Sequence, residues 1–289
     1  MSQISHLEQL YNQRVKVDES LQKDYQGLLK YVMDTVIARM KQSSPAFNAL
    51  YRETYYGGSF FDGLKVNSAE QEFDLNIVFK WKDKDLQVAD IGTDPKKKNF
   101  CYLDVTKPSL TPMEEKIVDT GTGSVQNLSP IKMFELVKSS VDRALTSLGL
   151  EVTYEGRRYR VTRHEYAPVT LDIRAVDGTR RCEVDLVPSL KMDLGVLAGE
   201  EALEARVTGL CDRYNVSRQT RGCMAISLHR ADKHRFELDF HDVERKILYN
   251  RGCVKKVVKL MKYLRDLKGG AMAKLWSHLL KVRKMEFKK

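Results

Sequence analysis

Two acidic residues separated by one position stand at the head of an apolar stretch, in Glu72-Phe73-Asp74. If this stretch is a strand, its side chains alternate between two faces, so Glu72 and Asp74 project side by side while Phe73 enters the core. Adjacent carboxylates repel each other unless a cation lies between them, and hard divalent ions such as Mg²⁺ bind carboxylate and phosphate oxygens together. The pair therefore indicates a phosphate-handling site, although a solvated strand edge is the commoner explanation of such a pair on its own.

A glycine turn, Gly57-Gly58-Ser59, precedes this pair. Backbone N–H groups of such a turn, together with the Ser59 hydroxyl, can bind phosphate oxygens. A third carboxylate from a separate strand would complete a two-metal site. Asp185 offers one, because acidic and apolar residues alternate over residues 182–187.

Apolar periodicity predicts the elements that must position these groups. Three- and four-residue spacing predicts a long amphipathic helix from Leu21 to about Ser44, and another from Pro130 to Gly149. Alternation predicts a strand over residues 73–81 with one buried face. Asp177-Gly178, between strand-like runs 170–176 and 179–187, predicts a hairpin. A further strand is expected over 100–106, and helices over 200–214, 241–250, 254–268 and from 271 onward.

The order of these elements predicts an α+β protein with two lobes. A mixed α/β lobe with a mixed β-sheet and a long N-terminal helix is expected over residues 1–198, followed by a helical lobe over 199–289. Because no low-complexity linker separates the two parts, we expect them to pack as one unit.

Composition narrows the class further. The 289 residues are 42% hydrophobic and 30% charged, the balance of a globular protein with a real core. No long uncharged apolar run and no secretory signal are visible, so neither membrane insertion nor export is supported, and a cytoplasmic location is expected. Five cysteines without a CxxC pair argue against a disulfide framework and a zinc knuckle.

Positive charge is concentrated near the C-terminus. Residues 251–289 hold 13 Lys and Arg against two acidic residues, whereas the preceding 250 residues hold 36 basic and 37 acidic ones. Such a block usually faces an anion, for example nucleic acid, nucleotide phosphates or an acidic surface. A solvated helix face is the alternative interpretation.

The ordered motifs together resemble cyclic GMP-AMP synthase (cGAS) and the cGAS-like receptors. They are GGSFFDGLKVNSAEQEFDLNIVF, VTLDIRAV, CEVDLVPSL, FELDFHDVERKIL, KLMKYL and KLWSHLLKV. The resemblance covers most of the chain and implies a bilobal nucleotidyltransferase fold with a long spine helix. By it, Glu72, Asp74 and Asp185 would be catalytic and hold two Mg²⁺ or Mn²⁺ ions. Gly58 and Ser59 would cradle the triphosphate, and Lys262 and Ser277 would contact a bound nucleotide.

The activity implied by this resemblance is synthesis of a cyclic dinucleotide from ATP and GTP, triggered by double-stranded nucleic acid in innate immunity. A downstream receptor would then bind the product. The alternative is a non-catalytic family member that binds nucleotide or nucleic acid as an interaction protein. Direct assay of a cyclic product separates the two.

Three departures from cGAS shape the expected partners. Only residues 251–254 stand where cGAS has its zinc insertion, so no zinc is expected, and the chain is more similar to the insect receptors, whose activator is double-stranded RNA rather than DNA. Lys255 and Lys259 match nucleic-acid-contacting lysines, and Arg39 and Lys41 end the helix that lines the same groove. Asp239 replaces a serine near the base. The chain ends after the helix around Ser277, whereas relatives continue with further helices, so either a short isoform or fragment or an abridged C-terminal lobe is expected.

Overall fold

The computed structural model describes residues 3–66, 71–89, 100–120, 126–147, 150–165, 169–193, 201–217, 222–227 and 235–268. Its helices are α1 Gln3–Leu10, α2 Glu19–Ser43, α3 Pro45–Leu50, α4 Gly58–Phe61, α5 Pro130–Ser147, α6 Glu201–Arg213, α7 His241–Leu248 and α8 Gly252–Lys268. A π-helical turn, η1, spans Tyr11–Val15, and 3-10 turns span Asp83–Asp85 (η2) and Glu114–Ile117 (η3). The strands are β1 Tyr51–Gly57, β2 Gln71–Phe79, β3 Leu86–Ala89, β4 Phe100–Val105, β5 Val118–Thr120, β6 Gln126–Leu128, β7 Glu151–Tyr154, β8 Arg157–Arg163, β9 Thr170–Ala175, β10 Arg181–Asp193, β11 Gly222–Ser227 and β12 Phe236–Asp239.

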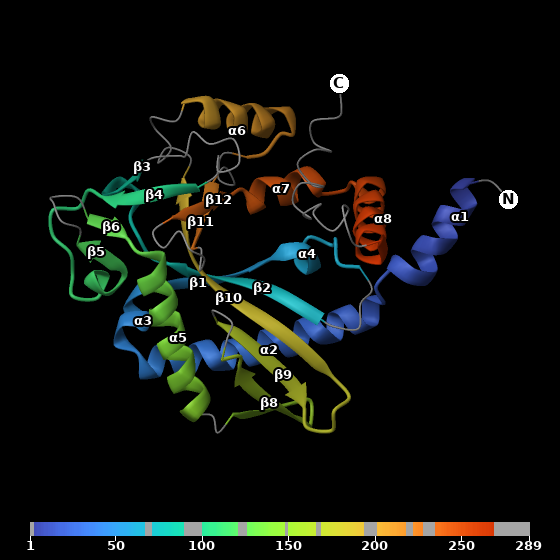
Figure 1. Cartoon of the computed structure of the whole chain (residues 1–289), viewed down its shortest axis with the longest axis horizontal. Helices are drawn as coiled ribbons and strands as arrows, with labels where there is room; N and C mark the ends of the chain where they lie inside the picture. The colour runs from blue at the N-terminus through green and yellow to red at the C-terminus, as the bar shows by residue number, and fades with distance from the viewer. Residues whose placement is uncertain are drawn as a thin grey trace.

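Strand β10 organises the described part of the sheet (Figure 1). On one edge its first residues pair with β9 and its last with β11, both antiparallel, while on the other edge it runs parallel to β2 from Cys182 to Leu190. The sheet continues through β12, β4, β6 and β5 in one direction and through β8 and β7 in the other. Strand β1 flanks β2 on its free edge. The mixed α and β content is therefore as predicted.

The long helix α2 forms because its sequence supplies both a cap and an apolar face. The Asp18 carboxylate accepts hydrogen bonds from the backbone N–H groups of Ser20 (2.8 Å) and Leu21 (3.2 Å), which satisfies two of the open donors of the first turn. The buried face is Tyr25, Leu28, Leu29, Val32, Met33, Val36, Ile37 and Met40. It packs against the inward side of β2, where the Tyr25 and Phe73 rings lie 6.3 Å apart. The prediction of this helix is confirmed.

The predicted hairpin and most predicted helices are also confirmed, with small shifts at their ends. Thr179 donates its backbone N–H to the Asp177 carboxylate at 3.0 Å, and Gly178 has φ +75°, which suits a tight turn between β9 and β10. The helix expected from residue 271 onward, including Ser277, lies outside the described residues.

Two expectations need correction. Strand β2 was expected to have one buried face throughout, but from Leu75 to Phe79 every residue is buried, Asn76 included, because β1 and β10 flank it and other elements cover both faces. Residues 199–289 are expected to form a helical lobe without strands, yet β11 and β12 lie within this range and extend the sheet. The boundary between the two expected lobes, between residues 198 and 199, stays a prediction.

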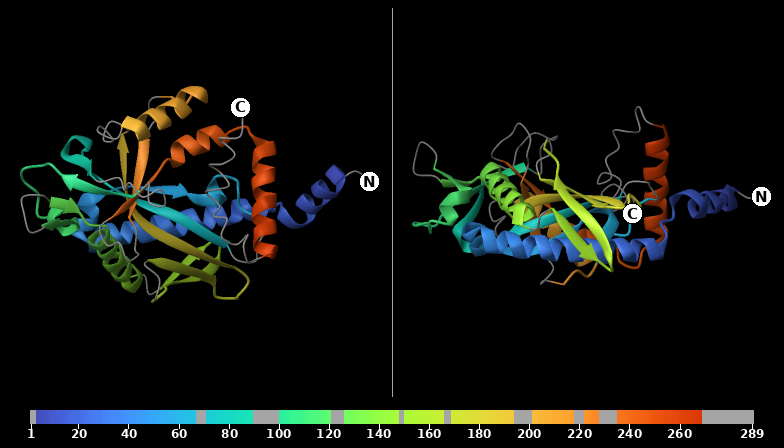
Figure 2. Two further views of the ribbon diagram at one scale, coloured as in Figure 1. Left: turned by 45° about the horizontal axis from the view of Figure 1, so that its top comes forward. Right: turned by 90° about the horizontal axis from the view of Figure 1, so that it is seen from below.

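Helix α8 stands at the end of the molecule where α2 begins, and it contacts η1 (Figure 2). Helices α7 and α8 are joined by only Tyr249, Asn250 and Arg251. None of the helices in the described ranges has the length and apolar character needed to cross a membrane.

Candidate active site

The three predicted carboxylates lie on one exposed face of two adjacent strands. Asp74 on β2 is the register partner of Asp185 on β10, and Glu72 is the partner of Glu183. Neighbouring strands are about 4.8 Å apart, so these side chains stand close together. Between them Phe73 and Val184 point into the core, with 1% and 0% of their surface exposed. Strand alternation thus exposes the acids and buries their neighbours.

This crowding raises the pKa of the Asp74 carboxyl above its ordinary value. The largest cause is that surrounding protein removes water from the carboxyl, although the residue keeps an exposed edge, and the negative charges of Asp185 and Glu72 add to it. The charge of His241 acts in the opposite direction. A cation bound beside the Asp74 carboxylate would favour its charged form.

The donor chemistry fits divalent ions. Carboxylate oxygens are the ligands that Mg²⁺ and Mn²⁺ prefer, and Mg²⁺ usually keeps positions for water and substrate phosphate. Within the part of the chain that the structure describes, no group of three His, Cys, Asp or Glu side chains is arranged so that it could hold a metal ion by itself.

The absence of a side chain at Gly58 lets the turn before β2 approach these acids closely. It opens α4 with φ +77°, a conformation that side chains rarely adopt, and a Cβ placed on it would overlap Asp74 Oδ2 and lie 3.2 Å from Asp74 Cγ. Only glycine fits this position. The turn that carries Gly58 and Ser59 thus lies directly against Asp74.

Helices α7 and α8 hold this turn from both sides. Arg245 donates from Nη2 to the carbonyl oxygen of Tyr56 at 2.8 Å, and its Nε lies 3.4 Å from the buried carboxylate of Asp62. Lys262, which is 6% exposed, donates to the carbonyl oxygen of Leu64 at 3.4 Å. Lys262 therefore reaches the segment after the Gly58-Ser59 turn, and its contact with a nucleotide stays a prediction.

Asp185 has a second neighbour that the sequence analysis missed. Thr170 on β9 is its register partner across the hairpin and donates a hydrogen bond from Oγ1 to Asp185 Oδ1 at 2.5 Å. Because the two residues are equally far from Asp177-Gly178, the hairpin signal alone could have paired them. Thr170 orients one oxygen of Asp185 from the side opposite Asp74.

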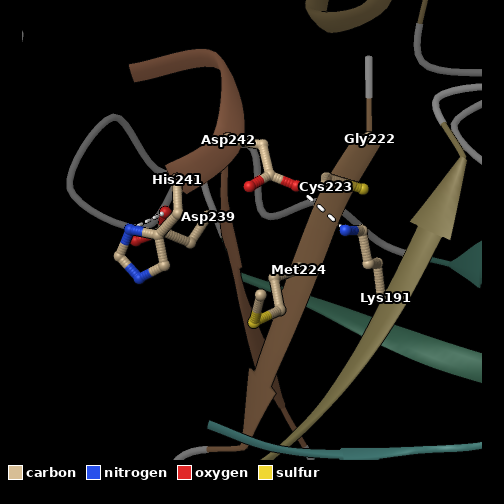
Figure 3. A pocket seen from close by; sticks show the side chains of 7 residues that line it. All are labelled: Lys191, Gly222, Cys223, Met224, Asp239, His241 and Asp242. Atoms are coloured by element: carbon tan, nitrogen blue, oxygen red, sulfur yellow. Dashed lines mark ion pairs between the residues drawn. The ribbon is translucent and has the colours of Figure 1, made fainter. Parts of the chain in front are cut away.

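A small open pocket lies at the start of β11 (Figure 3). Lys191 and Asp242 form an ion pair of 3.0 Å on one side of it, and His241 and Asp239 lie 2.8 Å apart on the other. The remaining lining residues are Gly222, Cys223 and Met224. The pocket combines an apolar floor with donors and acceptors.

His241 links this pocket to the turn at Gly57. A Cβ on Gly57 would lie 3.5 Å from His241 Nε2, and the His241 ring stacks on Tyr55 with centroids 5.9 Å apart. The Tyr55 hydroxyl in turn donates to Asp242 Oδ1 at 3.0 Å. Asp239, which the sequence predicts near a base, is part of the wall of this pocket.

The four predicted nucleic-acid contacts do not lie together. Lys255 and Lys259 share α8, where burial and then the charges of Lys255 and Lys16 lower the pKa of Lys259. These three lysines form what we term the α8 basic patch. Arg39 and Lys41 lie at the other end of α2, about 30 Å away along a helix that rises 1.5 Å per residue. Lys41 Nζ lies 4.0 Å above the Tyr51 ring.

Comparisons with known proteins find similarity over most of the chain. A family model described as the Mab-21 protein nucleotidyltransferase domain matches residues 60–250. A cyclic GMP-AMP synthase-like receptor of Trichogramma pretiosum is 24% identical over 263 residues, which cover 86% of this chain and 51% of that protein. One of Nicrophorus vespilloides is 25% identical, covering 82% and 62%. Cyclic GMP-AMP synthase-like receptor 1 of Drosophila melanogaster is 25% identical, covering 93% and 71%. The chain thus spans between half and two thirds of the first two relatives.

Proposed function

Because the chain belongs to the Mab-21 nucleotidyltransferase domain family, with the cGAS-like receptors among its relatives, we propose that it joins ATP and GTP into a cyclic dinucleotide after binding double-stranded RNA. The observation that carries the catalytic part is the parallel register of β2 and β10, which sets Asp74 against Asp185 with Glu72 on the same face. The Gly58-Ser59 turn lies directly beside them.

In this reaction the residues of the site would have separate roles. Divalent ions bound by Glu72, Asp74 and Asp185 would supply positive charge that activates a ribose hydroxyl and neutralises the pyrophosphate leaving group. Asp185 would accept the proton of the attacking hydroxyl, with Thr170 holding its Oδ1 in place. Ser59 and the backbone N–H groups of the turn would bind the triphosphate, which the missing Cβ at Gly58 admits close to Asp74.

Two transfers complete the reaction. In the first, the hydroxyl of one nucleotide attacks the α-phosphorus of the other, and a linear dinucleotide and pyrophosphate result. In the second, a hydroxyl of the linear dinucleotide attacks its remaining 5′ α-phosphorus, which closes the ring and releases a second pyrophosphate. The pocket lined by Asp239, His241 and Met224 would receive a base, since a purine needs an apolar surface and polar edge partners.

The α8 basic patch would contact the phosphate backbone of the duplex. A-form RNA is recognised by its shape and backbone, so a basic surface suffices without base contacts. Helix α8 also touches the segment after the Gly58-Ser59 turn through Lys262, and a Cβ on Gly63 would lie 3.5 Å from Lys255 Nζ. A duplex bound at α8 would therefore act on residues adjacent to the triphosphate site.

A ligand-panel assay tests this function. The full chain is incubated with ATP, GTP and Mg²⁺ or Mn²⁺, either alone or with double-stranded RNA or DNA, and nucleotide products and pyrophosphate are separated and quantified. We expect a cyclic product that depends on RNA and disappears in Asp185→Asn. Duplex binding by the folded protein without product under any condition would instead support the non-catalytic role.

A further inference from the structure

A second charged cluster lies on the same sheet face as the acids. At its centre is Asp172 on β9, whose side chain is 5% exposed. Arg174 donates from Nε to Asp172 Oδ2 at 2.6 Å, and Arg181 donates from Nε to Oδ1 at 3.2 Å. Arg174 and Arg181 are themselves register partners. A buried carboxylate thus fixes two guanidinium groups side by side, as a carboxylate behind a binding site orients the groups that contact the ligand.

Both guanidinium groups remain accessible. The Arg174 side chain is 56% exposed and that of Arg181 is 40% exposed. Asp172 engages Nε and Nη2 of Arg174, which leaves Nη1 outside this ion pair. Arg160 on β8 is the register partner of Arg174 and extends the row to a third strand.

Nearby carboxylates partly neutralise the positive charge of Arg160, Arg174 and Arg181. Glu183 accepts from Arg181 Nη2 at 2.5 Å, and Arg160 lies 3.3 Å from Glu151. His164 Nε2 lies 3.9 Å from Asp172 and 3.8 Å from Glu183. Arginine is suited to such a site because its planar fork binds phosphate oxygens with two parallel hydrogen bonds.

The open part of the sheet face leads from the acids to these arginines. Toward the end of β10, the residues on the face of Asp185 are half-exposed Val187 and Lys191, with buried Ser189 between them. Toward its start, the exposed or half-exposed positions on this face run from Asp185 through Glu183 to Arg181, about 13 Å at 3.3 Å per residue. A ligand that lies over Asp185 can therefore extend along this face to Arg181.

The proposed function places such a ligand there. In-line transfer puts the attacking hydroxyl and the leaving pyrophosphate on opposite sides of the α-phosphorus. With the donor triphosphate on the Gly58-Ser59 side of Asp74, the attacking nucleotide lies over β10 and β9, and its own phosphates project along the open face. We propose that Arg174 and Arg181, fixed by Asp172, bind the terminal phosphates of the attacking nucleotide and then of the linear dinucleotide. This inference rests on the proposed function for the identity of the ligand.

The test measures phosphate binding rather than turnover. Inorganic tripolyphosphate is titrated calorimetrically into the full chain without divalent ions, in a Lys255→Glu/Lys259→Glu background that removes most of the α8 basic patch. We expect Arg174→Ala/Arg181→Ala to weaken binding at least tenfold. Arg157→Ala is the matched control, because Arg157 also pairs with an aspartate (Asp177, 3.4 Å) on the same hairpin but faces the other side of the sheet.

Three results would overturn the subsite: no binding by the parent protein, equal binding by the double variant, or an equal loss in Arg157→Ala. A double variant that merely melts earlier while binding normally would show the cluster to be structural. Since no product is needed, absence of synthesis in the ligand panel would refute the proposed function and leave this result unaffected.

Discussion

Asp74 and Asp185 face each other across the only parallel strand pair in the described part of the sheet. This pairing brings together carboxylates from distant parts of the chain, and the pKa of Asp74 rises as water is displaced around it and the charges of Asp185 and Glu72 approach. Repulsion between these negative charges lowers the stability of the folded protein, and a bound cation would restore it. The consequences can be measured with and without metal.

The first prediction concerns pH. Because the pKa of Asp74 is raised in the folded state, the folded protein binds this proton more tightly than the unfolded chain does. The associated stability is present at low pH and is lost as pH rises through the folded pKa. In EDTA, Asp74→Asn should therefore melt at a higher temperature than the parent at pH 7, and the difference should vanish toward pH 4.

Magnesium supplies the control for that experiment. An ion that binds only the folded protein stabilises it by about 2.7 kcal/mol at one hundred times its dissociation constant. Mg²⁺ should raise the melting temperature of the parent and leave Asp74→Asn nearly unchanged. An Asp74→Asn variant that is less stable than the parent at neutral pH in EDTA would contradict the charge repulsion.

The second prediction separates two effects of replacing Gly58 with Ala, namely strain in the backbone and overlap of the new Cβ with Asp74. Gly58 and Gly178 have nearly equal φ angles, +77° and +75°, but a Cβ meets Asp74 at Gly58 and nothing within 4 Å at Gly178. Both Ala variants should lose about 1 kcal/mol of unfolding free energy from left-handed strain. Only Gly58→Ala should also lose Mn²⁺ affinity, measured by electron paramagnetic resonance. Equal Mn²⁺ affinity in the two variants would show that Gly58 does not shape the site.

The third prediction tests Thr170 as a positioning residue. Thr170→Val keeps the side-chain shape but removes the hydrogen bond to Asp185. Loss of a hydrogen bond that orients a metal ligand costs about 10- to 100-fold in metal affinity or activity. Thr170→Ser should restore most of the Mn²⁺ affinity because it retains the hydroxyl. A valine variant that binds Mn²⁺ as well as the parent would refute the role.

The fourth prediction concerns duplex RNA. Lys255→Glu/Lys259→Glu should weaken binding and reduce the slope of log affinity against log salt by about one per lysine that contacts a phosphate. Arg39→Glu/Lys41→Glu is a matched pair at the far end of α2 and should change neither quantity if the α8 basic patch is the whole contact. The reverse pattern would show that the duplex binds at Arg39 and Lys41 rather than at the α8 basic patch.

Local chemistry made part of this arrangement predictable. The α2 helix follows from a capping Asp18 and a regular apolar face, and the common face of Glu72 and Asp74 follows from strand alternation. The pairing of Thr170 with Asp185 was predictable as well, because the register of a tight hairpin is fixed by its turn. In each case the determining residues are close in sequence.

The remaining features depend on packing between distant segments. Nothing in residues 71–79 specifies β10 as the parallel neighbour, so the opposition of Asp74 and Asp185 required the tertiary structure. The burial of Lys262 against the Leu64 carbonyl is equally non-local, since a lysine in an amphipathic helix normally reads as exposed. Strands β11 and β12 are short and gain their stability from the sheet they join.

Binding of Mn²⁺ in the presence of a non-hydrolysable ATP analogue tests the central claim most directly. Electron paramagnetic resonance titration of the full chain should show ions bound together with the nucleotide, and Asp74→Asn or Asp185→Asn should abolish this binding. Asp193→Asn, an exposed aspartate further along β10, should leave it intact. Nucleotide-dependent Mn²⁺ binding that survives both Asp74→Asn and Asp185→Asn would contradict the account.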